Sequence, residues 1–214
     1  MNYKIDLHTH SIISRDGGIT ADQYTKILEK GLLDCVAITD HNEISFAHQM
    51  QEKLGNKIIV GEEITTTDGE LVGLFLQEVI PAGLTAQKTV DAIHKQGGLV
   101  YLPHPFETLR KGLQNEVAET LVAAIDIVEV FNARGQFRGK AKDAESFARR
   151  NSLSPAASSD AHGSVGLGSS FSVVSHMPSK SSLVTLLREG TLQKTYAPLW
   201  TYLYPMINRI KHAV

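Results

Sequence analysis

Histidines and acids recur in four short segments that could bind metal ions. Five of the nine histidines fall in residues 6–10, 39–41, 103–105 and 159–162, and three of these segments also carry an aspartate. Neutral imidazole nitrogens and carboxylate oxygens are the donors that a multinuclear metal site requires. No segment is long enough to surround an ion by itself, so the fold would have to bring the four together.

Two of the segments share one spacing. His8 and His10 are two residues apart on an extended segment, which directs both side chains to the same face. Asp160 and His162 repeat this spacing near the other end of the sequence. A hydrogen-bonded histidine pair at a strand end would explain His8 and His10 equally, but two such pairs favour metal binding.

Further candidates lie beside these pairs. Asp16 lies in a glycine-containing loop, where it could turn toward the site or form a plain Asx-turn. Asp40 precedes His41 and could be a ligand or the acceptor that orients an imidazole. Glu62 and Glu63 are adjacent carboxylates at a strand end, an arrangement that is costly without a cation. Two prolines restrict the direction of His104.

The hydrophobic pattern predicts alternating strands and helices, which is typical of an α/β barrel or a doubly wound sheet. We expect strands at 3–7, 34–39, 57–63, 70–76, 99–102, 126–131, just before Ser159 and at 171–174. Helices are expected at 20–30, 43–54, 85–96, 115–124, 138–150 and 181–189. The candidate residues, together with Glu129 and Asn132, lie at or just after the carboxyl ends of strands, where parallel folds gather catalytic groups. A closed barrel would bring them to one mouth.

Composition indicates one globular domain over 1–214, with 191–214 as a C-terminal extension packed on it. The formal charge of −2 makes nucleic acid an unlikely partner. Cys35 lies in an apolar run and is expected to be buried, and a lone cysteine fits a cytoplasmic protein. No stretch approaches the ~20 apolar residues of a membrane span. The apolar tail 198–206 is expected to pack as a helix, with a membrane or partner contact as the alternative.

The ordered motifs 6–11, 37–41, 61–64, 103–105 and 159–162 resemble those of the PHP (polymerase and histidinol phosphatase) domain family. The resemblance runs from about residue 3 to 175 and implies a distorted (β/α)7 TIM-like barrel that binds two or three Mn, Fe or Zn ions. It implies three ligand groups: His8, His10, Glu63 and Asp160 for the first ion; Glu63 and His104 for the second; Asp16, His41 and His162 for the third.

One position departs from the resemblance. The family often has a histidine in the strand after the bridging glutamate, and Glu70 occupies that position here. Either Glu70 binds the second ion, which favours Mn or Fe, or that site is weak. Asn132 could be a ligand or only line the pocket.

The resemblance implies a metal-dependent phosphoesterase that hydrolyses a small soluble phosphate ester, such as a nucleotide, sugar or amino-alcohol phosphate, with a metal-activated hydroxide. Arg134 and Arg138 are candidates for binding the phosphate, or are exposed residues at a helix start. Asp40 or Asp160 could take the leaving proton. Alternatives are an amidohydrolase-type C–N hydrolase, a phosphoesterase of nucleic-acid ends and an inactive metal-binding regulatory domain. The sequence does not indicate an oligomeric state.

Overall fold

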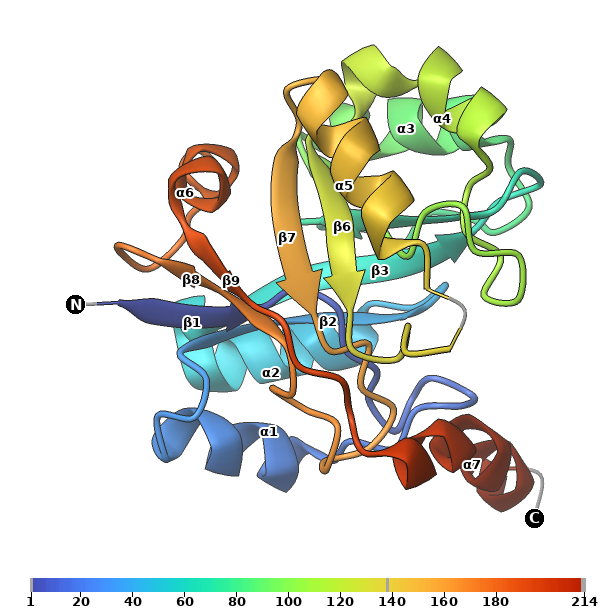
Figure 1. Ribbon diagram of the computed structural model, residues 1–214. Helices are drawn as coiled ribbons and strands as arrows, with labels where there is room; N and C mark the ends of the chain where they lie inside the picture. The colour runs from blue at the N-terminus through green and yellow to red at the C-terminus, as the bar shows by residue number, and fades with distance from the viewer. Residues whose placement is uncertain (1, 138, 213–214) are drawn as a thin grey trace.

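Nine strands form one mixed sheet that curls into a nearly closed barrel (Figure 1) in the computed structural model, which describes residues 2–137 and 139–212. Two parallel groups make up most of it: β1 (Tyr3–Asp6), β2 (Cys35–His41) and β3 (Ile58–Thr65), and β5 (Leu99–Leu102), β6 (Ile127–Asn132) and β7 (Ser154–Ser158). Between them, β4 (Glu70–Leu74) runs antiparallel to both neighbours. Outside β1 lie two antiparallel strands, β8 (Phe171–Val174) and β9 (Thr191–Gln193).

Segments beyond β1 and β7 close the barrel. Thr9 pairs with Ala161 in a parallel bridge, and the Asp160 amide donates to the His8 carbonyl at 2.9 Å. These bonds hold the carboxyl ends of the first and seventh strands side by side. The expected distorted, TIM-like α/β barrel is therefore confirmed. The three-residue β9 was not predicted, because so short a polar edge strand has no clear pattern.

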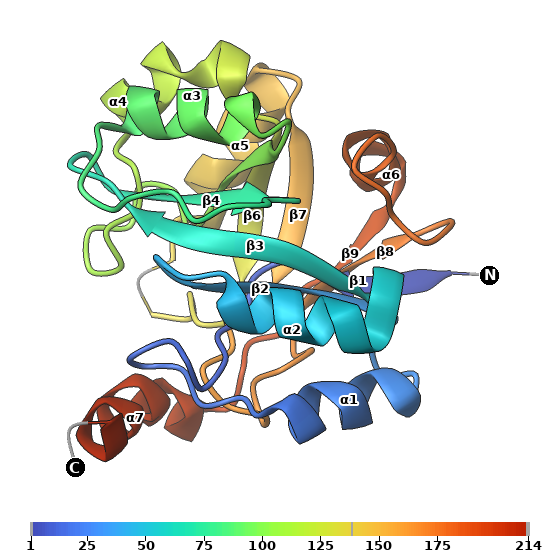
Figure 2. The same cartoon turned by 180° about the vertical axis from the view of Figure 1, so that it is seen from behind.

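Helices cover the outside of the barrel (Figure 2). On one side, α1 (Ala21–Glu29) and α2 (Ser45–Leu54) pack over β2 and β3 through a shared apolar cluster. On the other, α3 (Ala86–Lys95), α4 (Asn115–Thr120) and α5 (Ala141–Arg150) cover the strands from β4 to β7. The remaining helices in the described part of the chain are α6 (Leu183–Glu189), α7 (Tyr204–His212) and three short 3₁₀ turns, η1 (Gly55–Lys57), η2 (Val122–Ala124) and η3 (Leu199–Leu203).

Local signals explain several element boundaries. Thr20 accepts from the Gln23 amide, and the Gln23 side chain accepts from the Thr20 amide, which completes a capping box at the predicted start of α1. Gly31, just past the end of this helix, has a positive φ of 63°, which a residue with a Cβ adopts less readily.

Both faces of the central strands are buried. In β2, Cys35 and Ala37 face the barrel interior, whereas Val36 and Ile38 face α1 and α2. Tyr101 and α6 residues such as Leu183 belong to the interior cluster, so one end of the barrel is filled with apolar side chains. Polar groups gather at the other end. In the described ranges, no helix has the length and apolar content needed to cross a bilayer.

Candidate metal centre

A cavity of about 350 Å³ opens at the carboxyl ends of the strands. It is lined by residues from the barrel loops and the C-terminal segment: Asp16, His41, Glu63, Glu70, His104, Leu109, Arg110, Lys111, Arg134, Asp160, His162, Tyr202, Pro205, Met206 and Arg209. His8 and His10 are completely buried beside it. The nine ligands expected from the sequence therefore lie together, although they come from six separate parts of the chain.

The first group of donor atoms comprises His8, His10, Glu63 and Asp160. The two Nε2 atoms of His8 and His10 lie 3.2 Å apart, and Glu63 Oε2 lies 3.4 and 3.3 Å from them. Asp160 Oδ1 lies 3.8 Å from His8 Nε2 and 3.5 Å from His10 Nε2. A tetrahedral ion with bonds of about 2.1 Å separates its ligands by about 3.4 Å. The donor set and its spacing therefore fit one divalent ion.

A second group shares Glu63. Its other oxygen, Oε1, lies 3.0 Å from His104 Nε2. Donor atoms of Glu63, Glu70 and His104 all lie within 4.8 Å of one another. Since the two oxygens of Glu63 face different groups, this carboxylate has the geometry of a bridge between two ions.

The third group joins Asp16 to two histidines. Asp16 Oδ1 lies 3.6 Å from His41 Nε2 and 3.7 Å from His162 Nε2. This oxygen is buried and has no hydrogen-bond partner among the described residues. Leaving such an oxygen unpaired is costly, and a cation between the three side chains would satisfy it.

The electrostatics of the first two groups also favour a cation. Burial opposes the charged form of His8, but Glu63 and Asp160 outweigh it and hold the pKa of His8 well above its usual range. In the same way the pKa of His10 is raised to about 9. Burial and the neighbouring Glu63 raise the pKa of Glu70 to about 9. His8, His10 and Glu70 therefore retain protons, and a divalent ion bound by these side chains would release them.

Strand register explains why Glu63, and not Glu62, reaches this centre. His41 of β2 is the direct partner of Glu63 in β3, so both side chains project into the barrel mouth. Glu62 lies on the opposite face, where one carboxylate oxygen accepts from the Ile80 amide at 2.8 Å. Burial there raises the pKa of Glu62 to about 7.

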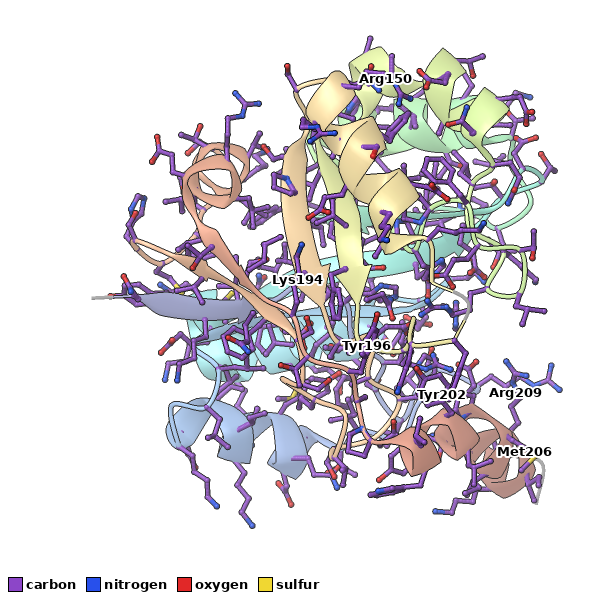
Figure 3. All side chains as sticks on the ribbon, viewed as in Figure 1. Arg150, Lys194, Tyr196, Tyr202, Met206 and Arg209 are labelled. Carbon is purple, nitrogen blue, oxygen red and sulfur yellow. The ribbon has the colours of Figure 1, made fainter. Side chains whose placement is uncertain are left out.

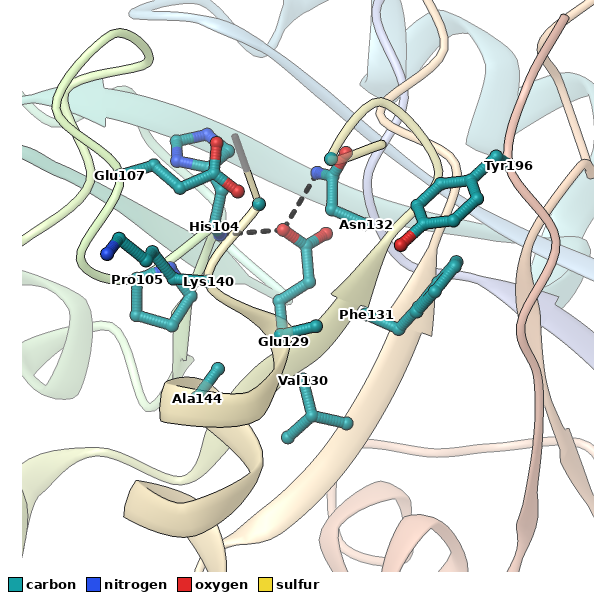
Figure 4. Close-up of a pocket in the computed structure, with 13 residues that line it drawn as sticks. His104, Pro105, Glu107, Glu129, Val130, Phe131, Asn132, Lys140, Ala144 and Tyr196 are labelled. Carbon is teal, nitrogen blue, oxygen red and sulfur yellow. Dashed lines mark hydrogen bonds between the residues drawn. The ribbon is translucent and has the colours of Figure 1, made fainter. Parts of the chain in front are cut away.

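Glu129, a strand-end candidate to which the sequence assigned no role, contacts His8 and His104, and Figure 4 shows it beside His104 and Asn132. Its Oε1 is 3.2 Å from His8 Nδ1 and accepts from the Tyr101 hydroxyl at 2.8 Å. Its Oε2 accepts from the His104 amide and the Asn132 side chain at 2.6 and 2.9 Å. A bulge between Glu129 and Phe131 puts positions 129 and 132 on one side of β6. The sequence signal for a special role of Glu129 is its position as an acid within the apolar run 127–131.

The arginine side chains at the centre are mostly paired with acidic groups. Arg110, which we did not predict, donates to Asp160 Oδ2 at 2.8 Å and to Asn132 Oδ1 at 2.6 Å, and its remaining donors face Glu107. Asn132 thus lies between Arg110 and Glu129, and it is not among the described residues that line the cavity. Arg134 lines the cavity, and its Nη1 lies 3.3 Å from Asp160 Oδ1. Arg138, the other predicted phosphate-binding residue, lies outside the described residues.

Asp40 is not among the described residues that line the cavity. Its two oxygens accept from the amide and hydroxyl of Ser11, at 2.6 and 2.5 Å. The sequence left open whether Asp40 is a ligand, an acceptor for an imidazole or a proton acceptor. Its contacts are those of a residue that fixes the loop after His10.

Two of the candidate ligands have an uncommon backbone. His104 has a φ of 26° and Asp160 a φ of 50°, both in the left-handed region that non-glycine residues seldom adopt. Such strain persists where surrounding bonds hold it, often at functional sites. Here the His104 amide is held by Glu129 and the Asp160 amide by the His8 carbonyl.

Residues outside the centre also match their predictions. Cys35 is completely buried, and burial together with Asp34 raises the pKa of its thiol to about 12. The histidines that the sequence assigned to the surface or to structural roles, His48, His94, His176 and His212, are all at least partly exposed.

Comparisons with known proteins agree with this fold. A family model described as PHP-associated matches residues 140–192. The uncharacterized protein MJ1587 of Methanocaldococcus jannaschii is 36% identical over 143 residues, which cover 61% of this chain and 82% of that protein. MJ0417 of the same organism is 37% identical over 171 residues, covering 74% of this chain and 65% of that protein. The chain belongs to the PHP domain family.

Solved structures share the fold at low identity. One is a two-domain protein from Bacteroides vulgatus containing a predicted PHP-like metal-dependent phosphoesterase, with a TM-score of 0.74 and 19% identity, covering 91% of this chain and 65% of that one. Another is the lesion-specific endonuclease PfuEndoQ from Pyrococcus furiosus, with a TM-score of 0.67 and 17% identity, covering 90% of this chain and 57% of that one. This chain thus spans about two thirds or less of each of these structures.

Proposed function

We propose that the protein is a metal-dependent phosphoesterase that hydrolyses a small soluble phosphate ester. The observation that carries this proposal is the shared carboxylate of Glu63, whose two oxygens face separate histidine groups beside a cavity with Arg110, Arg134 and Lys111 on its wall. Paired divalent cations next to guanidinium groups suit a phosphoryl group, whose charge spreads over three oxygens during transfer. The names of the Bacteroides and Pyrococcus structures support the same reaction class.

The ligand assignment follows the three donor groups. In this proposal His8, His10, Glu63 and Asp160 hold one ion; Glu63, Glu70 and His104 a second; and Asp16, His41 and His162 a third. When bound, the ions lower the pKa of a water toward ~7, which makes hydroxide available near neutral pH. The mixed nitrogen and oxygen donors suit Mn, Fe or Zn, and the additional carboxylate of Glu70 favours Mn or Fe.

Arg134 is proposed to bind the phosphate. Its Nε is buried and has no hydrogen-bond partner among the residues that the structure describes. This donor is free for a phosphate oxygen, and a guanidinium can bind two such oxygens at once. Arg110, by contrast, uses its donors on Glu107, Asn132 and Asp160. We assign Arg110 to holding Asp160 in place.

Asp160 is a poor candidate for the acid that protonates a leaving group. Although burial favours its neutral form, Arg134 and His8 outweigh this and hold the pKa of Asp160 well below its usual range. The side chain therefore stays anionic near neutral pH, which suits a metal ligand.

A small substrate is favoured by the boundaries of the cavity. Tyr202, Pro205 and Met206 limit it on one side, and the loop 109–111 supplies further lining residues. A volume of about 350 Å³ is of the size that holds a small molecule. A phosphoesterase of nucleic-acid ends is the alternative that the test below must separate.

The test is a hydrolysis screen of Mn-loaded protein. The panel contains nucleotides, sugar phosphates, amino-alcohol phosphates, 5′-phosphorylated oligonucleotides and an amide series. We expect turnover of small phosphate esters that His10→Ala and Asp160→Asn abolish and that His176→Ala, an exposed histidine outside the centre, retains. Turnover of oligonucleotides alone would favour the nucleic-acid alternative, and turnover of amides alone an amidohydrolase. No turnover at full metal content would favour a regulatory domain.

A further inference from the structure

The C-terminal helix α7 packs on the metal centre through polar side chains. Asn208, at 5% exposure, is the buried residue of α7. Met206 and Ile210 of the same helix remain 55% and 61% exposed. Figure 3 labels Tyr202, Met206 and Arg209 along this C-terminal segment. An amphipathic surface helix normally buries its apolar stripe, so burial of the Asn208 amide requires another explanation.

The amide of Asn208 joins two loops that carry candidate ligands. Its Nδ2 donates to the carbonyl oxygen of Asp16 at 2.9 Å and to that of His162 at 2.8 Å. These two residues are far apart in sequence, yet both belong to the third donor group. One NH₂ group therefore fixes the backbone of two members of this group relative to each other.

The next residue of α7 holds the Asp16 side chain itself. Arg209 donates to Asp16 Oδ2 at 2.8 Å. With Oδ2 held in this way, the unpartnered Oδ1 faces His41 and His162. Asn208 and Arg209 thus act on the backbone and the carboxylate of the same candidate ligand.

Two glycines provide the room that this packing needs. A Cβ at Gly18 would lie 2.8 Å from Asn208 Nδ2, and a Cβ at Gly163 would lie 2.6 Å from the ring of Tyr204. Both distances are too short for a real contact. Neither glycine has a positive φ, so a turn conformation does not explain them. The two loops are therefore shaped to accept α7 against the third donor group.

We propose that α7 is a clamp that preorganises the third ion site, with Asn208 as its positioning residue. This inference rests on the proposed function only in that it uses the donor group of Asp16, His41 and His162. The first group depends on other elements: His8 and Asp160 are held by Glu129 and Arg110, and among the described residues neither forms a hydrogen bond or ion pair with α7. Loss of the clamp should therefore weaken one ion and spare the others.

The experiment compares Mn²⁺ binding by the full-length wild type, Asn208→Ala and Asn208→Asp. The aspartate has the shape of the asparagine but presents oxygens to two carbonyl groups. Lys211→Ala, an exposed position on the same helix, is the matched control. Isothermal titration gives the affinities, elemental analysis gives the ions per chain, and melting of the metal-free proteins in EDTA reports the fold. Partners of metal ligands typically change affinity about 10- to 100-fold, so the weakened ion should lose at least about tenfold in both Asn208 variants.

Each outcome decides the inference. Selective loss of one ion in both Asn208 variants, with the control unchanged, supports the clamp. Equal affinities in all four proteins, or equal weakening of every ion, overturn it and leave the proposed function intact. A wild type that binds only two ions removes the third site and the clamp but keeps a two-ion phosphoesterase. A wild type that binds none refutes the proposed function as well.

Discussion

The substitution Glu129→Gln tests whether Glu129 fixes which ring nitrogen of His8 carries the proton. Each Glu129 oxygen accepts from two donors: His8 and Tyr101 on Oε1, His104 and Asn132 on Oε2. Since Glu129 is an acceptor, the His8 proton belongs on Nδ1, and the lone pair of Nε2 faces the first donor group. Glutamine keeps the shape of the side chain but turns one oxygen into an NH₂ group.

Either orientation of the new amide opposes two donors. If the NH₂ group faces Asn132 and the His104 backbone amide, two N–H donors meet it, and neither donor can reorient without moving its residue. The less costly orientation points it at His8, which must then accept at Nδ1 and carry its proton on Nε2. That tautomer cannot bind an ion through Nε2. Losing one hydrogen bond to a charged group costs about 1.5–3 kcal/mol, which corresponds to about 10- to 150-fold in affinity.

The assay is Mn²⁺ titration of Glu129→Gln beside wild type, with Tyr101→Phe as a matched variant at the same carboxylate. Tyr101→Phe removes one donor without changing the His8 tautomer, so we expect less than about a threefold change. Glu116→Gln, at an exposed carboxylate of α4, controls for the substitution itself. Affinities of Glu129→Gln within twofold of wild type for every ion would refute the tautomer argument.

Four further predictions concern single positions. Glu70→Gln should lower the occupancy of the second ion, and unchanged metal content by elemental analysis would remove Glu70 from the ligand set. Arg134→Met should raise KM about tenfold or more, with partial rescue by Arg134→Lys; an unchanged KM would contradict phosphate binding. Burial raises the pKa of Glu62 from 4.5 to about 7. The protonated side chain therefore contributes to the stability of the folded protein fully below pH 4.5, and this contribution is lost as the pH rises through 7. Glu62→Gln should therefore raise the free energy of unfolding by up to about 3 kcal/mol at pH 8 and by little at pH 4 in urea titrations, and an equal change at both pH values would contradict this. Cys35 should resist thiol reagents at pH 8 until the protein unfolds, and rapid labelling of the native protein would contradict its burial.

The sequence by itself determined the elements and the chemistry of the donors. Strand and helix positions follow from local periodicity and capping, as at Thr20, because these forces act between residues close in the chain. The spacing of His8 and His10 also set their common direction, since alternation in an extended segment needs no tertiary information. The placement of candidate ligands after strand ends then led to a single barrel mouth.

Only the tertiary structure decided which face each acid occupies and what supports it. The local pattern does not distinguish Glu62 from Glu63, and only the family resemblance selected Glu63. The pairing of β3 with β2 gives the physical reason, because it turns Glu62 toward Ile80 and Glu63 into the centre. Asp40 was expected near the chemistry, but its contacts to Ser11 depend on a loop from another part of the chain.

The role of Glu129 was not predicted, and Arg110 and Asn208 were missed, for the same physical reason. Each acts through hydrogen bonds to residues remote in sequence, such as Glu129 to His8 and Asn208 to Asp16. Such bonds form only when the barrel closes and the tail packs across its mouth, and no local pattern of residues encodes them. The local sequence therefore identifies the donor residues, whereas the closed barrel and the C-terminal helix determine where those residues lie.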